Sequence, residues 1–191
     1  MRKVLLCAAI SAVLGMNKMA KAQNGSRYSA PQIRLPLLQK APLIDGVIHD
    51  NEWQGADRME RFGRPEPLAP QKAGFWVGAD AQNLYLAVRS ETPPGGQLLQ
   101  RANPLPTGTN ARSYDDDSIE LYLCPKPGGG ANEQSVYQII FHAKGAVFSQ
   151  AFTAHGGEAW HGDWTIKNSI SDDHWDCEMA LPWKDIAVGN M

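Results

Sequence analysis

The sequence predicts an all-β protein, an antiparallel β-sandwich of the jelly-roll kind. Two observations lead to this fold class. Short segments of alternating apolar residues recur at spacings of roughly 8–12 residues, and glycine- or proline-rich turns separate them. In addition, no helical period of apolar residues extends beyond two turns anywhere in the 191 residues.

The first 22 residues are predicted to be a signal peptide. Arg2 and Lys3 form a basic start, an apolar run follows over residues 4–16, and Ala20-Lys21-Ala22 has the small-x-small pattern of a cleavage site. The apolar run is shorter than the roughly 20 residues that a membrane-spanning helix needs. We therefore expect cleavage after Ala22 and a secreted or periplasmic protein without a membrane span.

The charge that remains after cleavage excludes two classes of partner. The mature chain would carry 14 basic residues (18 less Arg2, Lys3, Lys18 and Lys21) against 20 acidic ones, a net charge of −6. Such a balance argues against nucleic acid or an anionic membrane surface as the partner. Residues 23–40 are expected to be a linker or an edge strand, and residues 41–191 a single domain.

The first half of that domain begins with turns. Residues 42–48 carry a turn signal at Asp45-Gly46 between apolar pairs, and Asp50 is suited to cap a single helical turn that buries Trp53. Residues 75–79 and 84–88 alternate as two strands. Residues 93–112 then form a long irregular stretch, and such loops in compact domains usually bind something or are disordered.

The second half contains the most informative strand, residues 118–123. Ile119, Leu121 and Leu123 share one face, while Ser118, Glu120 and Tyr122 share the other. Further strands are expected at 136–142, 146–152, 164–170 and 175–181, with a loop at 155–162 and a closing element at 182–185. Trp53, Trp175 and Trp183 are expected to be core anchors.

Taken in order, five segments resemble carbohydrate-binding module family 9, or a close relative among the sugar-binding β-sandwiches. They are I-D-G-V-I-H-D-N-E-W (44–53), V-G-A-D-A-Q-N-L-Y-L-A-V (77–88), D-D-S-I-E-L-Y-L (116–123), Y-Q-I-I-F (137–141) with Gly145, and W-D-C-E-M-A-L-P-W-K-D-I (175–186). The resemblance implies an antiparallel sandwich that binds sugars, is often attached to polysaccharide-degrading enzymes and often contains structural calcium. It also implies closing strands and a second stacking ring after the P-W-K element, so the domain is expected to be incomplete at its C-terminal end.

The first group of candidate ligand-binding residues precedes the strand at 118–123. Tyr114 stands where the resemblance implies a stacking ring, and three consecutive carboxylates follow it. Adjacent carboxylates repel each other, so they are tolerated in solvent or beside a donor-rich or cationic ligand. Asp115 and Asp116 could accept hydrogen bonds from sugar hydroxyls, or could be an ordinary acidic loop. Asp117 is expected to fix the turn.

Three more candidates lie elsewhere. Glu120 could contact a ligand if its sheet face is concave, or could be a solvated strand position. Trp76 falls on the polar side of its strand and is a candidate surface platform, while Trp160 in the glycine-containing loop could line a groove. Ile140 stands where the resemblance implies a basic sugar contact.

No cofactor is required by the sequence, and metals have few candidate ligands. Asp45, Asp50 and Asp80 are oxygen ligands suited to calcium, although Asp-Gly and Asp-x-x-Asn are also ordinary turns. The His155–His161 stretch lacks metalloprotease spacing. Cys124 and Cys177 could form one disulfide, or Cys177 could be a small buried hydrophobe.

The leading hypothesis is a non-catalytic module that binds a polysaccharide or oligosaccharide, with a C-terminal catalytic or membrane module in a longer protein as a candidate partner. One alternative is a glycoside hydrolase segment using Asp115, Asp117 or Glu120, which would need two carboxyl groups at a defined separation and one raised pKa. Another is an envelope or adhesion β-sandwich without a sugar site.

Overall fold

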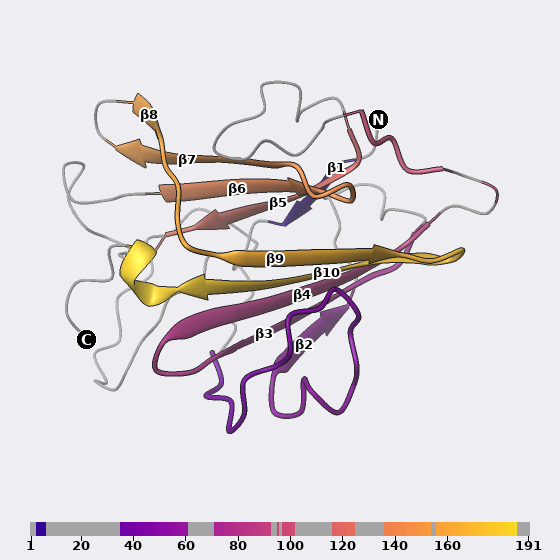
Figure 1. Ribbon diagram of the computed structural model, residues 1–191, viewed down its shortest axis with the longest axis horizontal. Coiled ribbons are helices and arrows are strands. Elements are labelled where there is room, and N and C mark those ends of the chain that lie inside the picture. Colours follow the sequence, from indigo (N-terminus) through magenta and orange to yellow (C-terminus); the bar gives the residue numbers. More distant parts are fainter. Residues whose placement is uncertain are drawn as a thin grey trace, which may run out of the picture.

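The described residues form two five-stranded sheets, as the computed structural model shows (Figure 1). The structure describes the backbone of residues 3–6 and residues 35–60, 71–92, 95, 97–101, 116–124, 136–153 and 156–186. Apolar side chains from both sheets meet in one core cluster, so the sheets pack face to face. The predicted all-β sandwich is confirmed.

The first sheet has the order β1-β5-β6-β7-β8. Its strands are β1 (Lys3–Leu6), β5 (Ser118–Leu123), β6 (Val136–His142), β7 (Val147–Thr153) and β8 (Gly156–Ala159). β5 to β8 pair antiparallel with their neighbours, whereas β1 pairs parallel with β5. In Figure 1 this sheet occupies the upper part of the view.

The second sheet has the order β2-β3-β4-β10-β9 and is antiparallel throughout. Its strands are β2 (Asp57–Glu60), β3 (Ala73–Ala79), β4 (Asn83–Glu91), β9 (Thr165–Ile170) and β10 (His174–Pro182), and the 3-10 turn η2 (Trp183–Asp185) follows β10. β4 and β10 are the longest strands and pair over nine residues, so they form the centre of this sheet.

Alternation along the strands builds the core. Phe75 and Val77 of β3, Leu86 of β4, and Ile119 and Leu121 of β5 all point inward and are almost fully buried. Each such side chain contributes roughly 1.5–3 kcal/mol through burial. Trp53 and Trp175 are buried and Trp183 packs against the core, as predicted for all three.

A second, smaller cluster lies on the outer face of the second sheet. The segment 35–56 covers that face, and Leu38, Ile48 and Trp53 from the segment pack on Trp76, Tyr85 and Ala87 of the strands. Figure 1 shows the segment, coloured indigo to purple, beside β2 and β3. Leu37 adds one isolated parallel bridge to Ala79.

Most strand boundaries match the sequence prediction within two residues, and three local features differ. β8 was expected to be loop, because its two glycines hide the strand signal. β2 was also missed. The single helical turn expected after Asp50 is replaced by two backbone turns, closed by hydrogen bonds from Glu52 N to His49 O and from Ala56 N to Trp53 O.

β1 falls within the predicted signal peptide and pairs with β5 from Lys3 to Leu6. Cleavage after Ala22, and with it secretion, stays a prediction. No helix in the described ranges is long and apolar enough to cross a membrane.

Candidate carbohydrate-binding face

The outer face of the first sheet carries a row of polar side chains. The alternation predicted for β5 is confirmed, since Glu120 and Tyr122 point away from the core. Strand register places Gln138 of β6 opposite Tyr122, and Gln150 of β7 opposite Gln138. These four residues, Glu120, Tyr122, Gln138 and Gln150, are called the polar row below.

Hydrogen bonds connect the polar row from end to end. The Tyr122 hydroxyl donates to Glu120 Oε1 over 2.9 Å. Gln138 Nε2 donates to the same carboxylate oxygen and, over 2.8 Å, to the Tyr122 hydroxyl. Gln150 Nε2 then donates to Gln138 Oε1. The arrangement suits the recognition of hydroxyl groups, because ionised carboxylates and amide oxygens are strong acceptors.

Exposure changes along this face. Glu120, Tyr122, Gln150 and Phe152 are half-buried, whereas Gln138, Ile140 and His142 of β6 are buried. The accessible part of the face therefore contains three members of the polar row, with the buried Gln138 between them. Phe152 of β7 adds an aromatic ring beside it, in register with Val136.

His142 is the one ionisable group on the buried part of this face among the described residues of β5 to β8. It is fully buried and lies opposite Ser118. Burial lowers its pKa, and the nearby Asp116 carboxylate opposes that shift. The imidazole is therefore neutral at physiological pH.

The described residues include only part of the predicted acidic loop. Tyr114 and Asp115 lie outside the described residues, so their roles stay predictions. Asp116 is described and is only 2% exposed, which places it inside the fold rather than in an open acidic loop. Glu120 is half-buried in the polar row.

Asp117 fixes the approach to β5, as expected. Its carboxylate Oδ2 accepts from Leu99 N over 2.9 Å, and its own N–H donates to Leu99 O over 3.1 Å. These two bonds fasten the segment 97–101 to the start of the strand. A carboxylate engaged in this way is poorly placed to act as a catalytic acid or nucleophile.

Trp76 does not form an exposed platform, so that expectation is wrong. Its ring is only 6% exposed, within the cluster formed by the segment 35–56, and the Arg58 guanidinium lies 4.8 Å from the ring centroid. Gly78 leaves room for the covering segment, because a Cβ atom there would lie 2.6 Å from Leu38 Cγ. Alternation placed Trp76 outside the sandwich core correctly, but the sequence did not reveal the cover.

Trp160 is half-buried and packs against the main core. Its ring centroid lies 4.6 Å from that of Tyr137 and 5.0 Å from that of Trp164, and its Nε1 donates to Asp185 O over 3.0 Å. The residue thus ties the connection before β9 to η2. A ligand contact by Trp160 stays a prediction.

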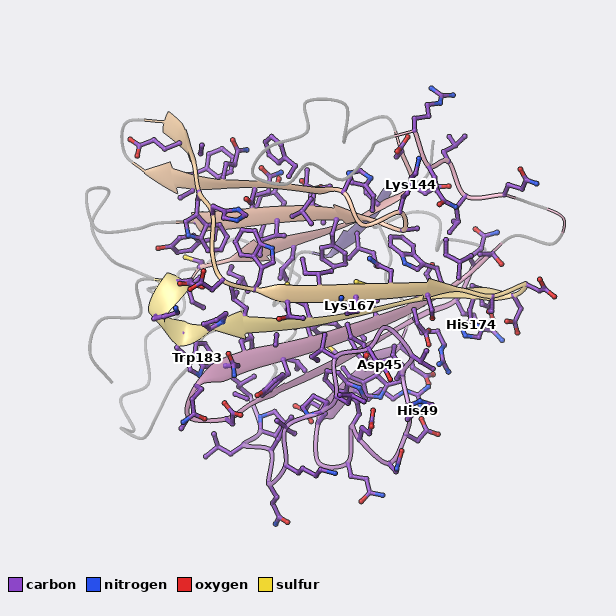
Figure 2. The ribbon with its side chains drawn as sticks, in the orientation of Figure 1. Asp45, His49, Lys144, Lys167, His174 and Trp183 are labelled. Atoms are coloured by element: carbon purple, nitrogen blue, oxygen red, sulfur yellow. The ribbon has the colours of Figure 1, made fainter. Side chains whose placement is uncertain are left out.

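Two buried acids of β10 hold the segment 35–56 on the opposite sheet. Glu178 accepts from Asp45 N, Gly46 N and Trp53 Nε1 over 3.1, 2.9 and 2.9 Å. Burial raises its pKa in spite of these donors. Figure 2 shows Asp45 and His49 beside this sheet, with His174 and Trp183 toward its opposite ends.

Asp176 is the second of these acids and forms a paired contact with Arg89. Arg89 Nε and Nη2 reach the two carboxylate oxygens over 2.7 and 2.6 Å, and Ile48 N donates to Oδ2 over 3.1 Å. The Asp176 carboxylate raises the pKa of Arg89. Both acids thus have structural partners that explain their burial.

The three predicted calcium ligands lie in or next to bends and turns of the chain. Asp45 Oδ1 accepts from Val47 N, and Asp50 is exposed. Burial alone would raise the pKa of Asp80, but hydrogen bonds from Tyr85, Gln82 and Asn83 bring it below its usual value. Among the described residues, no three His, Cys, Asp or Glu side chains gather as metal ligands. Calcium binding stays a prediction.

Cys124 and Cys177 do not form a disulfide.

The sequence reasoning missed Gln138 and Gln150. Each occupies an outward strand position, where a lone glutamine is an ordinary solvated residue. The signal that could have found them is register: outward polar residues on three neighbouring strands fall on one line only when β5, β6 and β7 are aligned.

Comparison with known proteins supports the fold. No protein-family model matches the chain, and no curated protein matches it. Among solved structures, a Bacteroides uniformis protein proposed to bind carbohydrate has a TM-score of 0.57 and 11% identity, over 83% of this chain and 75% of that one. The predicted resemblance to sugar-binding β-sandwiches is confirmed at the level of the fold.

Two further structures are a family 9 carbohydrate-binding module from Caldicellulosiruptor kristjanssonii with cellotriose and with glucose. Their TM-scores are 0.44 and 0.46, at 15% and 16% identity and over 75% and 76% of this chain. The chain spans 64% and 66% of the length of those two structures.

Proposed function

We propose that this protein is a non-catalytic carbohydrate-binding module whose sugar-contacting surface includes the polar row on the first sheet. The observation that carries the proposal is the continuous hydrogen-bonded polar row, whose end residues Glu120 and Gln150 are half-buried on a sheet face. Hydroxyl-rich ligands suit such a surface, because each sugar hydroxyl can donate to a fixed acceptor. The similarity in fold to a protein proposed to bind carbohydrate agrees with this function.

A binding role fits the acidic groups better than hydrolysis does. Glycoside hydrolysis needs two carboxyl groups about 5–9.5 Å apart, one of them protonated near neutral pH. The Asp117 carboxylate is bonded to the Leu99 amide, and Glu120 accepts hydrogen bonds from Tyr122 and Gln138, so both carboxylates are engaged within the protein. We therefore propose positioning of a glycan rather than its cleavage, in a secreted or periplasmic protein that also contains a polysaccharide-degrading module.

The expected affinity is modest. A stacked aromatic ring adds about 0.5–1.5 kcal/mol beyond its burial, and a net hydrogen bond about 0.5–1.5 kcal/mol. A dissociation constant of 1 mM already requires about 4 kcal/mol. A few contacts on one sheet face therefore predict binding in the millimolar to high micromolar range.

Calorimetric titration with cellotetraose and xylotetraose tests the proposal. We expect heat of binding from the full chain and at least a tenfold loss in Glu120→Ala, because a hydrogen bond to a charged group contributes about 1.5–3 kcal/mol. Tyr114→Ala checks the stacking ring expected from the sequence. Glu158→Ala is the matched control, since Glu158 is an exposed carboxylate of β8 outside the polar row. Unchanged affinity in Glu120→Ala would rule out this surface.

A further inference from the structure

We propose that Gln150 is a specificity-determining residue whose carbonyl oxygen is held toward the ligand by a hydrogen-bond relay that starts at Glu120 and runs through Gln138. The inference rests on the proposed function. It adds the direction, from donor to acceptor, in which the hydrogen bonds of the polar row run. In this relay Gln138 is a positioning residue and Gln150 is the residue that contacts the ligand.

The direction of the relay follows from the charge at its start. An ionised carboxylate can only accept hydrogen bonds, so the groups that face Glu120 Oε1 must donate. They are the Tyr122 hydroxyl, at 2.9 Å, and Gln138 Nε2. Gln138 Nε2 also donates to the Tyr122 hydroxyl. The amide nitrogen of Gln138 therefore lies on the side of β5.

The orientation of Gln138 then determines that of Gln150. With its nitrogen toward Glu120, Gln138 presents Oε1 to β7, and an amide oxygen requires a donor. Gln150 Nε2 supplies it. The remaining polar atom of that side chain, Gln150 Oε1, therefore faces away from Gln138. A single negative charge on β5 thus determines which atom is presented two strands away.

The position of Gln150 Oε1 is set by β8. A Cβ atom built on Gly157 would lie only 2.8 Å from this oxygen, so glycine leaves the space that the oxygen occupies. Within the described part of the chain, no donor is assigned to Gln150 Oε1 or to Glu120 Oε2, and neither atom is buried without a partner. Both ends of the row therefore offer acceptors.

An acceptor at each end defines the ligand chemistry. A neutral saccharide can donate a hydroxyl to both positions, whereas a ligand carboxylate or sulfate would face acceptors. The neighbouring strands do not offset this preference, because the sequences of β5 to β8 contain Glu120 and Glu158 and no lysine or arginine. The row therefore selects hydroxyl donors and disfavours anionic groups.

A double-mutant cycle tests the relay. The full chain and its Gln138→Met, Gln150→Met and double variants are titrated with cellotetraose, xylotetraose and tetragalacturonate. Methionine keeps the side-chain length and removes the amide. We expect each single variant to bind the better neutral ligand about 5- to 10-fold more weakly, which corresponds to one lost hydrogen bond. We expect the double variant to lose no more than either single variant, because both break the same relay.

The cycle separates the relay from the proposed function. If the unchanged chain binds none of the three oligosaccharides, both are overturned. If it binds but Gln150→Met binds equally well, or if the two single losses add fully in the double variant, only the relay is overturned. Glu158→Gln, which removes a negative charge outside the row, should leave the affinities unchanged. Thermal unfolding of each variant, and the ratio of neutral to anionic affinity, distinguish lost recognition from lost folding.

Discussion

The indole nitrogen of Trp53 donates to Glu178 Oε1 over 2.9 Å, so a side chain from the segment before β2 is bonded to a carboxylate at the centre of the second sheet. The same carboxylate receives Asp45 N and Gly46 N through its other oxygen. The turn and the tryptophan are therefore fastened at one point. These contacts explain how the I-D-G and E-W parts of one motif come to lie against the W-D-C-E motif, in which Glu178 follows Trp53 by 125 residues.

Replacement of Glu178 should destabilise the fold strongly. Glu178→Ala leaves two buried donors and one part-buried donor without an acceptor, and we expect a loss of about 3–5 kcal/mol in the free energy of unfolding. Urea denaturation measures it. Glu158→Ala, which changes an exposed glutamate of β8, should cost less than about 0.5 kcal/mol. Equal effects of the two substitutions would contradict the role assigned to Glu178.

Two ion pairs near β10, one with a buried carboxylate and one exposed, should differ sharply in their contribution to stability. Asp176 is fully buried, and Arg89 is 37% exposed, so Arg89→Met leaves a buried charge and should cost about 3 kcal/mol. Lys184 and Asp163 form an exposed pair, and Lys184→Met should leave stability almost unchanged. The measurement is urea denaturation at low and at high salt, with salt affecting the exposed pair more.

A control for the first of these pairs removes both charges together. Arg89→Met combined with Asp176→Asn should recover part of the loss caused by Arg89→Met alone, because no uncompensated carboxylate remains. Additive losses would show that packing of the Arg89 stem, rather than the charge of Asp176, dominates.

His142 should make the protein less stable in mild acid. Its pKa is lowered in the fold by burial, so below the ordinary value of 6.5 the unfolded chain binds more protons than the folded one. Stability therefore falls as pH decreases from 6.5 toward the lowered value, by at most about 1.4 kcal/mol per pH unit from this group. Denaturation at pH 7.5 and 5.5 should show a smaller difference in His142→Leu than in the unchanged chain.

The exposed His49 offers the comparison for that measurement. His49→Leu should retain the pH dependence of the unchanged chain. If His142→Leu retained it as well, the buried imidazole would not be its source.

Gly78 should be intolerant of a side chain. A Cβ atom there would lie 2.6–2.7 Å from three carbons of Leu38, which also binds β3 through a 2.7 Å hydrogen bond from its N–H to Ala79 O. We expect Gly78→Ala to cost about 1–3 kcal/mol through overpacking. The double variant with Leu38→Ala should cost less than the two single losses combined, as measured by thermal unfolding.

Local patterns predicted most strands of this protein, because alternation is a property of the segment itself. The spacing of Ile119, Leu121 and Leu123 alone predicts that they share one face of β5, and alternation likewise predicts the strands that became β9 and β10. β8 was not predicted because its glycines carry no apolar signal, and β2 was not predicted because D-R-M-E has no clear alternation.

The candidate site, like the fold, was predictable from the sequence only in part. Glu120 was found from its place on the outward face of β5, which the sequence of one strand suffices to define. Trp76 was assigned to the surface by the same logic and is covered, because a segment of about twenty residues lies over its sheet. No pattern within β3 contains information about that cover.

By itself, the sequence determined the fold class, the inward and outward faces of the main strands and the resemblance to sugar-binding sandwiches. These depend on side-chain periodicity and on turn residues, which act over a few positions. Only the tertiary structure decided that Gln138 and Gln150 join Glu120, that Glu178 holds the turn at Asp45 and that Asp176 holds Ile48. Contacts of this kind depend on strand register and on which segments pack together, and long-range packing is settled only when the whole chain folds.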